Sequence, residues 1–271
     1  MTISIPRLDL MIAYSCNLSC RGCISISDRQ RDGVEPYQKL QQSIVHWSKL
    51  ISPDVVSLFG GEPLLHPRLF DVIRLVREHW NHATIRLITN GYLLTRFDPK
   101  SWFEFNNFEM QVSLHRLDHR KLLQDEVAKI IRCRHPWTVR SFDEADHKQL
   151  SWQYDSIKIY FSIFKDFVVP YQAQGQKILP WRSDPADAHK ICGAPNTPVL
   201  HRGKLYKCPA VANAIELAKE NWFNYHPVED LTGLQDFVDR IGKPETVCGQ
   251  CPNQTQAVII DHFDSRNVDV R

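Results

Sequence analysis

The chain has 271 residues and a formal net charge of +2, with 43% hydrophobic and 24% charged residues. This length suffices for one large domain with a small appendage, and the composition is ordinary for a water-soluble protein. The near-neutral charge excludes a basic surface for nucleic acid and a charged block for membranes. No apolar run approaches the roughly 20 residues of a membrane span, and the start MTISIPRLDL lacks a secretory signal. We therefore expect a cytoplasmic protein without nucleic-acid or membrane partners.

Strands and helices are predicted to alternate over the first two-thirds of the chain. Short apolar runs predict strands, and apolar residues three or four positions apart predict helices. The predicted strands are Arg7–Ala13, Val55–Phe59, Thr84–Thr89, Phe108–Leu114 and Ile157–Phe161, and the predicted helices are Tyr37–Ile51, a segment after Pro67, and Leu122–Ile131. Such alternation is typical of parallel strands joined by right-handed crossovers, and so predicts an α/β fold.

The residues best suited to chemistry follow the ends of these strands. Cysteines follow the first strand and Gly60-Gly61-Glu62-Pro63 follows the second. Asn90-Gly91 closes the third strand, while Ser113 and His115 end the fourth. Because loops at the carboxyl ends of parallel strands converge, we expect these residues to form one site.

Eight cysteines need an explanation in a reducing compartment, where metal or catalytic roles are commoner than disulfides. Seven of them fall into two groups. The N-terminal cysteine group is Cys16, Cys20 and Cys23, and the C-terminal cysteine group is Cys192, Cys208, Cys248 and Cys251. The eighth, Cys133, lies in a helix-like run and is interpreted as a small buried hydrophobic residue.

The N-terminal cysteine group has the spacing CxxxCxxC. Thiolates suit either zinc or an iron–sulfur cluster. With zinc, a distant histidine would have to supply a fourth ligand; with a four-iron cluster, one iron would stay open for chemistry. The paired glycines of Gly60-Gly61-Glu62-Pro63 allow close approach of the backbone to a ligand, although a tight strand-to-helix turn is the alternative.

Together these two motifs, in this order, resemble the radical S-adenosylmethionine (SAM) superfamily over roughly residues 7–165. The resemblance implies a partial (β/α)6 TIM-type barrel, with a [4Fe–4S] cluster on Cys16, Cys20 and Cys23 whose open iron chelates SAM. It places Gly60, Gly61, Glu62 and Pro63 at the methionine end of SAM. It also makes Asn90, Ser113 and His115 cofactor-binding candidates. One departure is Gly22, where many members carry an aromatic residue that flanks adenine; Tyr14 is a candidate to take that contact.

The C-terminal cysteine group supplies four thiolates, which suit zinc or a second cluster. Cys192 and Cys208 flank a predicted hairpin that turns at Arg202-Gly203. The segment fits a CX10GX4C pattern and resembles the opening of SPASM domains and of their shortened twitch form. With four cysteines rather than seven, the resemblance implies a twitch domain with one auxiliary [4Fe–4S] cluster. We therefore predict a barrel over residues 1–170 and a hairpin-plus-helix twitch domain over residues 171–271.

The resemblance implies a radical SAM oxidoreductase. SAM would be cleaved to a 5′-deoxyadenosyl radical, which removes a hydrogen atom from substrate, and the auxiliary cluster would accept an electron. Known twitch proteins include dehydrogenases of an aminocyclitol alcohol. Peptide-modifying relatives usually carry a peptide-binding domain first, which we do not expect here because the first strand begins near residue 7. The leading prediction is thus dehydrogenation of a small polar molecule such as a sugar or cyclitol, with an external electron donor of flavodoxin or ferredoxin type.

Three residues before the C-terminal cysteine group are candidates for contact with substrate or for proton transfer, namely Arg182, Asp184 and His189. The alternative for Asp184 is an ordinary helix N-cap before Pro185. Two other functions stay open at this point: a maturase acting on a ribosomal peptide, and a non-catalytic zinc-binding module.

Overall fold

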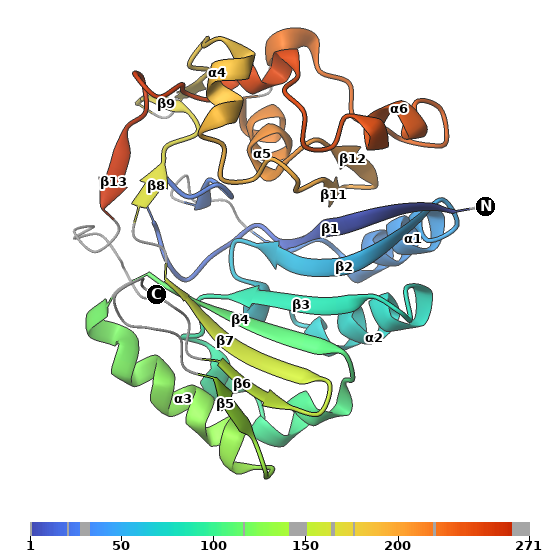
Figure 1. Ribbon diagram of the computed structural model, residues 1–271, viewed down its shortest axis with the longest axis vertical. Coiled ribbons are helices and arrows are strands. Elements are labelled where there is room, and N and C mark those ends of the chain that lie inside the picture. Colours follow the sequence, from blue (N-terminus) through green and yellow to red (C-terminus); the bar gives the residue numbers. More distant parts are fainter. Residues whose placement is uncertain are drawn as a thin grey trace.

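The computed structural model describes residues 2–20, 22–27, 33–115, 117–140, 151–163, 166–175, 177–218 and 221–261 (Figure 1). Within these residues the main sheet has nine strands in the order β12-β11-β1-β2-β3-β4-β7-β6-β5. Their bounds are β1 Ile3–Ala13, β2 Ile51–Gly60, β3 Thr84–Thr89, β4 Phe108–Leu114, β5 Thr138–Arg140, β6 Ser151–Tyr154, β7 Ile157–Ile163, β11 Val199–His201 and β12 Lys204–Tyr206.

The centre of the sheet is parallel. Strands β11, β1, β2, β3, β4 and β7 pair in parallel with their neighbours, while β12, β6 and β5 are antiparallel additions at the two edges. Helix α1 (Tyr37–Trp47) connects β1 to β2 and α2 (Leu69–His79) connects β2 to β3, while α3 (Arg120–Arg132) follows β4. The predicted α/β fold with parallel strands is confirmed.

Several element ends differ from the predictions because pairing between distant segments extends the strands. The helix predicted to reach Ile51 ends at Trp47, since Ile51 already pairs with Ile3 and opens β2. Strand β6 was not predicted. It folds back on β7 through a turn in which Asp155 has a φ of 51°.

Alternation along the strands separates two environments. On β1, Leu8, Leu10 and Ile12 belong to the large core cluster, which also holds Leu40, Ile44 and Trp47 of α1. The helices therefore cover one face of the sheet. The residues between them on β1, such as Arg7 and Asp9, face the opposite, concave side.

The C-terminal part of the chain lies against β1 and β11, above the sheet in Figure 1. Its helices are α4 Pro185–Lys190, α5 Pro209–Ala218 and α6 Leu234–Asp239, and its small sheets pair β8 Asp166–Val168 with β13 Ile259–Asp261 and β9 Gln172–Gln174 with β10 Lys177–Leu179. Short 3-10 helices occur at Pro63–Leu65, Leu94–Arg96, Pro99–Glu104, Leu117–His119, Trp222–Asn224 and Thr246–Gln250.

The hairpin predicted between Cys192 and Cys208 is present as β11 and β12, with its turn at Arg202-Gly203. Helix α5 follows it. Because β11 pairs with β1, the regions predicted as residues 1–170 and 171–271 share one sheet. None of the helices in the described part of the chain has the length and apolarity that crossing a bilayer requires.

Candidate functional site

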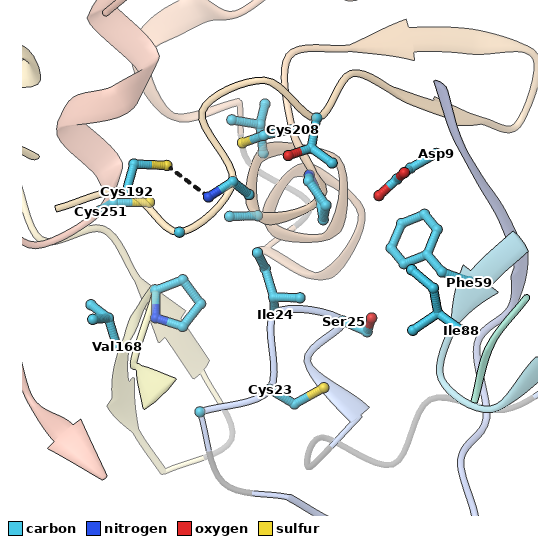
Figure 2. A pocket seen from close by; sticks show the side chains of 18 of the residues that line it. Asp9, Cys23, Ile24, Ser25, Phe59, Ile88, Val168, Cys192, Cys208 and Cys251 are labelled. Carbon is cyan, nitrogen blue, oxygen red and sulfur yellow. Dashed lines mark hydrogen bonds between the residues drawn. The ribbon is translucent and has the colours of Figure 1, made fainter. Parts of the chain in front are cut away.

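A cavity of about 530 Å³ lies between the concave face of the sheet and the C-terminal part of the chain. All seven cysteines of the two groups line it, and so do Gly60, Gly61, Asn90, Ser113, His115 and His189. In Figure 2, Cys192 and Cys251 lie across the cavity from Phe59 and Ile88, with Cys23 between the two sides. The fold thus brings together residues that are more than 200 positions apart in the sequence.

The loop of the N-terminal cysteine group follows β1 and is tied to the end of β3. The Nδ2 atom of Asn90 donates to Asn17 Oδ1 at 2.8 Å and to Cys16 Sγ at 3.7 Å. The backbone N–H of Leu18 also donates to Cys16 Sγ, at 3.4 Å. Burial raises the pKa of Cys16 to about 12, and the charge of Glu62 adds to this effect. Asn90 therefore positions the cysteine loop as well as lining the cavity.

The paired glycines let β2 approach that loop closely. The Gly61 N–H donates to Ala13 O and the Glu62 N–H donates to Ser15 O, both at 2.9 Å. A Cβ atom on Gly60 would overlap the main chain of Ala13, and one on Gly61 would overlap Ser15 O. Gly60 also has a φ of 145°, which a side chain disfavours. Both positions therefore require glycine.

Glu62 and Pro63 point away from the cavity. Glu62 is fully enclosed and accepts three hydrogen bonds, from Leu64 N at 2.9 Å, Thr89 Oγ1 at 2.6 Å and Asn90 N at 2.8 Å. Burial raises its pKa to about 7. Glu62 thus ties the end of β2 to the end of β3, and Pro63 opens the short helix that follows. Of the four motif residues, Gly60 and Gly61 line the cavity.

Ser113 and His115 line the cavity at the end of β4, as Asn90 does at the end of β3. Burial lowers the pKa of His115 to about 4, because a charged imidazolium would lose its hydration there. Its imidazole is therefore neutral at neutral pH.

Three separate segments present the four residues of the C-terminal cysteine group. Cys192 follows α4 and Cys208 precedes α5, while Cys248 lies in the helix Thr246–Gln250 and Cys251 ends it. Backbone N–H groups donate to two of the sulfurs: Ala194 to Cys192 and Glu245 to Cys248, both at 3.4 Å. Burial raises the pKa of Cys208 to about 12 and raises that of Cys251 as well, and the neighbouring thiols add to both shifts.

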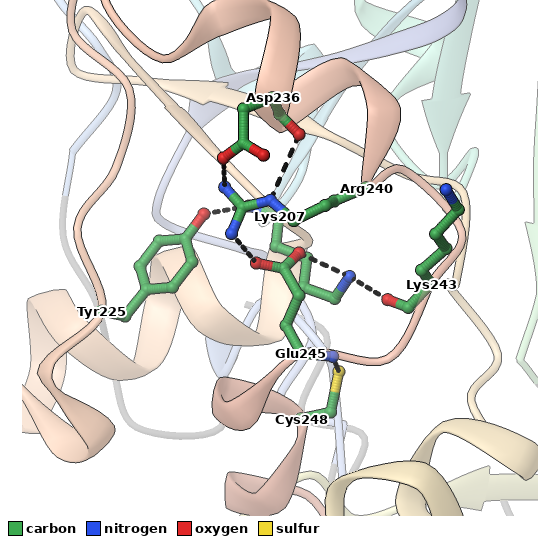
Figure 3. A network of polar contacts seen from close by, with 7 residues as sticks. All are labelled: Lys207, Tyr225, Asp236, Arg240, Lys243, Glu245 and Cys248. Atoms are coloured by element: carbon green, nitrogen blue, oxygen red, sulfur yellow. Dashed lines mark hydrogen bonds and ion pairs between the residues drawn. The ribbon is translucent and has the colours of Figure 1, made fainter.

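A buried ion pair joins two of these segments (Figure 3). The Nζ atom of Lys207 donates to Glu245 Oε1 at 2.8 Å and to Lys243 O at 2.6 Å. The Lys207 N–H donates to Tyr225 Oη at 2.8 Å, and Arg240 pairs with the other oxygen of Glu245 at 3.2 Å. Since Lys207 precedes Cys208 and Glu245 precedes the helix of Cys248, this network fixes both cysteine-bearing segments.

The residues present fit soft-metal clusters. Thiols whose pKa is raised by burial and by one another become thiolates when a metal supplies positive charge. Backbone donors already face several of the sulfurs, as in iron–sulfur sites. In the described part of the chain, no three His, Cys, Asp or Glu side chains gather around one point that could hold a single metal ion. The two cysteine groups instead surround the cavity.

The three residues predicted to contact substrate or transfer a proton lie in different environments. Arg182 and Asp184 are exposed and do not line the cavity. The Asp184 side chain instead accepts the Asp187 N–H at 3.0 Å and caps α4, which is the N-cap alternative. His189, near the end of α4, does line the cavity. Burial, and then the charge of Lys207, lowers its pKa.

The sequence analysis missed polar residues on the cavity side of the strands. Arg7, Asp9 and Gln111 line the cavity, although they lie within strands rather than at strand ends. The available signal was alternation: Arg7 and Asp9 occupy every second position of an otherwise apolar strand.

Residues 10–145, half of the chain, match the model of the Radical SAM superfamily. The chain therefore belongs to this superfamily and is a radical SAM enzyme. Membership implies a [4Fe–4S] cluster and SAM as cofactors.

Similar proteins cover different fractions of the chain. The GTP 3′,8-cyclase of Yersinia pestis is 30% identical over 116 residues, which are 42% of this chain and 35% of the cyclase. The mycofactocin maturase MftC of Mycobacterium ulcerans is 27% identical over 114 residues, which are 37% of this chain and 29% of the maturase. The chain thus spans about a third of the length of these curated relatives. A solved structure of BtrN with AdoMet and 2-DOIA covers 99% of both chains, with a TM-score of 0.51 and 18% identity, and shares the fold.

Proposed function

We propose that this radical SAM enzyme dehydrogenates an alcohol of a small polar substrate, such as a sugar or cyclitol. The observation that carries the proposal is the common cavity: both cysteine groups line it, together with Gly60 and Gly61. Substrate bound there would lie within reach of both cysteine groups.

Cys16, Cys20 and Cys23 would hold the first [4Fe–4S] cluster, which when bound supplies the electron that cleaves SAM to methionine and a 5′-deoxyadenosyl radical. The main chain of Gly60 and Gly61 would receive the methionine end of SAM. Asn90, Ser113 and His115 would contact its remaining polar groups. Glu62 and Pro63 would act indirectly, by holding the glycine turn against the cysteine loop.

Cys192, Cys208, Cys248 and Cys251 would hold a second [4Fe–4S] cluster as the electron acceptor. Four thiolates close such a site completely, and the Lys207–Glu245 ion pair holds two of the ligand segments in place. A zinc ion on the same residues is the alternative for this site.

The overall reaction balances in atoms and electrons. A C–H bond of the substrate alcohol breaks and its hydrogen atom joins the adenosyl carbon, which gives 5′-deoxyadenosine. The substrate radical then loses the hydroxyl proton and one electron and becomes a ketone. That electron would pass to a cluster held by Cys192, Cys208, Cys248 and Cys251, and it would offset the one used to cleave SAM. Net, SAM and the alcohol give methionine, 5′-deoxyadenosine, the ketone and a proton.

The chain's own residues orient the substrate, exclude water and remove the proton. Of the three candidates for proton transfer, His189 alone lines the cavity, so we assign the proton to its imidazole. An external donor of flavodoxin or ferredoxin type would supply the first electron.

The choice of a small substrate is supported by the match along the whole chain to BtrN, whose solved structure contains AdoMet and 2-DOIA. The cyclase and the maturase match over much shorter segments.

Two measurements test the proposal. Anaerobically reconstituted protein should contain about eight irons per chain, on the basis of four per cluster, with matching sulfide and no zinc. About four irons plus one zinc would overturn the electron-acceptor role. Sugars or cyclitols, but not peptides, should stimulate 5′-deoxyadenosine formation and yield a ketone. Stimulation by peptides alone would make the protein a peptide maturase.

A further inference from the structure

A row of polar residues crosses the side of the main sheet that faces the cavity. The parallel register places Asp9 beside Ser57, Ser57 beside Arg86, Arg86 beside Glu109, and Glu109 beside Lys158. Side chains at one register position of neighbouring parallel strands point to the same face. Because Asp9 lines the cavity, this row faces the cavity side of the sheet.

The charges in this region pair with one another. Arg7 binds Asp9 through two hydrogen bonds, from Nε to Oδ1 at 2.6 Å and from Nη2 to Oδ2 at 3.2 Å. Arg86 Nε pairs with Glu109 Oε2 at 2.8 Å. Lys158, at the end of the row, places its ammonium 4.8 Å from the centre of the Tyr160 ring. The two arginines therefore neutralise the charges of the two acidic residues on this side of the sheet.

Asp9 of this row lines the cavity, together with Arg7 of the same strand and Gln111 of β4. Asp9 is only 3% exposed, and Figure 2 places it beside Phe59 and Ile88 on the sheet side of the cavity. Gln111 accepts a hydrogen bond from Tyr160 Oη at 3.0 Å, which fixes its amide. We call Arg7, Asp9 and Gln111 the polar floor.

The cavity offers little positive charge for an anionic substrate. Among the described residues, the lining side chains with a permanent positive charge are Arg7 and Lys207. Arg7 pairs with Asp9, and Lys207 pairs with Glu245 at 2.8 Å. A phosphate group there would have to compete with a carboxylate already in place, at the cost of its own desolvation.

We propose that the polar floor is a subsite for hydroxyl and amino groups of the substrate, and that its internal charge pairing selects a ring without phosphate. Carboxylate, guanidinium and amide groups on one surface offer both acceptors and donors to such a ring. The inference rests on the proposed function and narrows its substrate class. A subsite of this kind would disfavour a nucleoside triphosphate as the substrate.

Two sugars that differ only by a phosphate group test this substrate selectivity in a binding measurement. Reconstituted enzyme loaded with SAM is titrated calorimetrically with glucosamine and with glucosamine 6-phosphate. We expect glucosamine to bind at least tenfold more tightly. Equal affinities, tighter binding of the phosphate, or no binding of glucosamine would overturn the proposal.

The Asp9→Asn variant tests the charge argument directly. It keeps the side-chain shape but leaves Arg7 unpaired, so the preference for glucosamine over its phosphate should fall at least tenfold. The matched control is Asp71→Asn, which removes an acid paired with Arg68 on the outer helix α2 and should leave the preference unchanged. An unchanged preference in Asp9→Asn contradicts the role of the pair.

A second variant covers the case in which Asp9→Asn does not fold. Gln111→Glu keeps the acceptor for Tyr160 and adds a negative charge, so the preference for glucosamine should rise several-fold. A preference that stays the same or falls contradicts the proposal. Iron content and ketone formation, measured on the same samples, report separately on the proposed function.

Discussion

The buried carboxyl of Glu62 should make the free energy of unfolding depend on pH. Glu62 has no exposed surface and accepts hydrogen bonds from Leu64, Thr89 and Asn90. Burial raises its pKa to about 7 from an ordinary value of 4.5. The perturbation is Glu62→Gln, which keeps the shape and removes the titration.

The folded state keeps the Glu62 proton to a higher pH than the unfolded chain, so folding takes up a proton between about pH 4.5 and pH 7. The stability that this proton contributes is full below that window and is lost as the pH rises through it. The difference between a pKa of 4.5 and one of about 7 corresponds to about 3 kcal/mol. Between pH 5 and pH 8 the free energy of unfolding of Glu62→Gln should therefore gain about 2–3 kcal/mol relative to wild type.

Urea unfolding of reduced, cluster-free protein, followed by tryptophan fluorescence at pH 5, 6, 7 and 8, measures this difference. The control is Glu78→Gln, which makes the same change of residue type on the exposed side of α2. If the difference between Glu62→Gln and wild type stays constant from pH 5 to pH 8, or matches that of the control, burial does not raise the pKa of the Glu62 carboxyl as described above.

Three further predictions concern the two cysteine groups. Cys20→Ala should abolish 5′-deoxyadenosine formation and remove about half of the iron, since one cluster loses a ligand; activity retained in a chromatographic assay would contradict the assignment. Gly61→Ala should lower SAM affinity at least tenfold in equilibrium dialysis, because the new methyl group overlaps Ser15 O, whereas unchanged affinity would mean that the turn relaxes freely. Lys207→Met should remove the shorter of the two ion pairs of Glu245, whose other oxygen stays paired with Arg240, and should lower the free energy of unfolding in urea by about 1–3 kcal/mol, with loss of the second cluster by iron analysis. Lys190→Met, at an exposed pair on α4, should change neither the stability nor the iron content.

The sequence alone determined the local chemistry. Cysteine spacing, the paired glycines and the ends of the apolar strands predicted where Cys16, Gly61 and Ser113 would converge, because these signals depend on short stretches of chain. The α/β alternation was readable for the same reason: strand and helix periods are local properties. The Asp184 cap was also visible as an alternative, since an Asp-Pro pair at a helix start is a local signal.

Only the tertiary structure decided which distant residues share a surface. The pairing of β11 with β1 brings the C-terminal cysteine group to the cavity, and no local pattern specifies that partner. Likewise, Asp9 and Arg86 face the cavity side together because the strand register aligns them, and register is set by packing over the whole sheet. The side chain of Glu62 turns inward to bind Thr89 and Asn90, since a buried carboxyl must find donors. Sequence therefore determined the kind of chemistry, and long-range packing decided which side chains surround it.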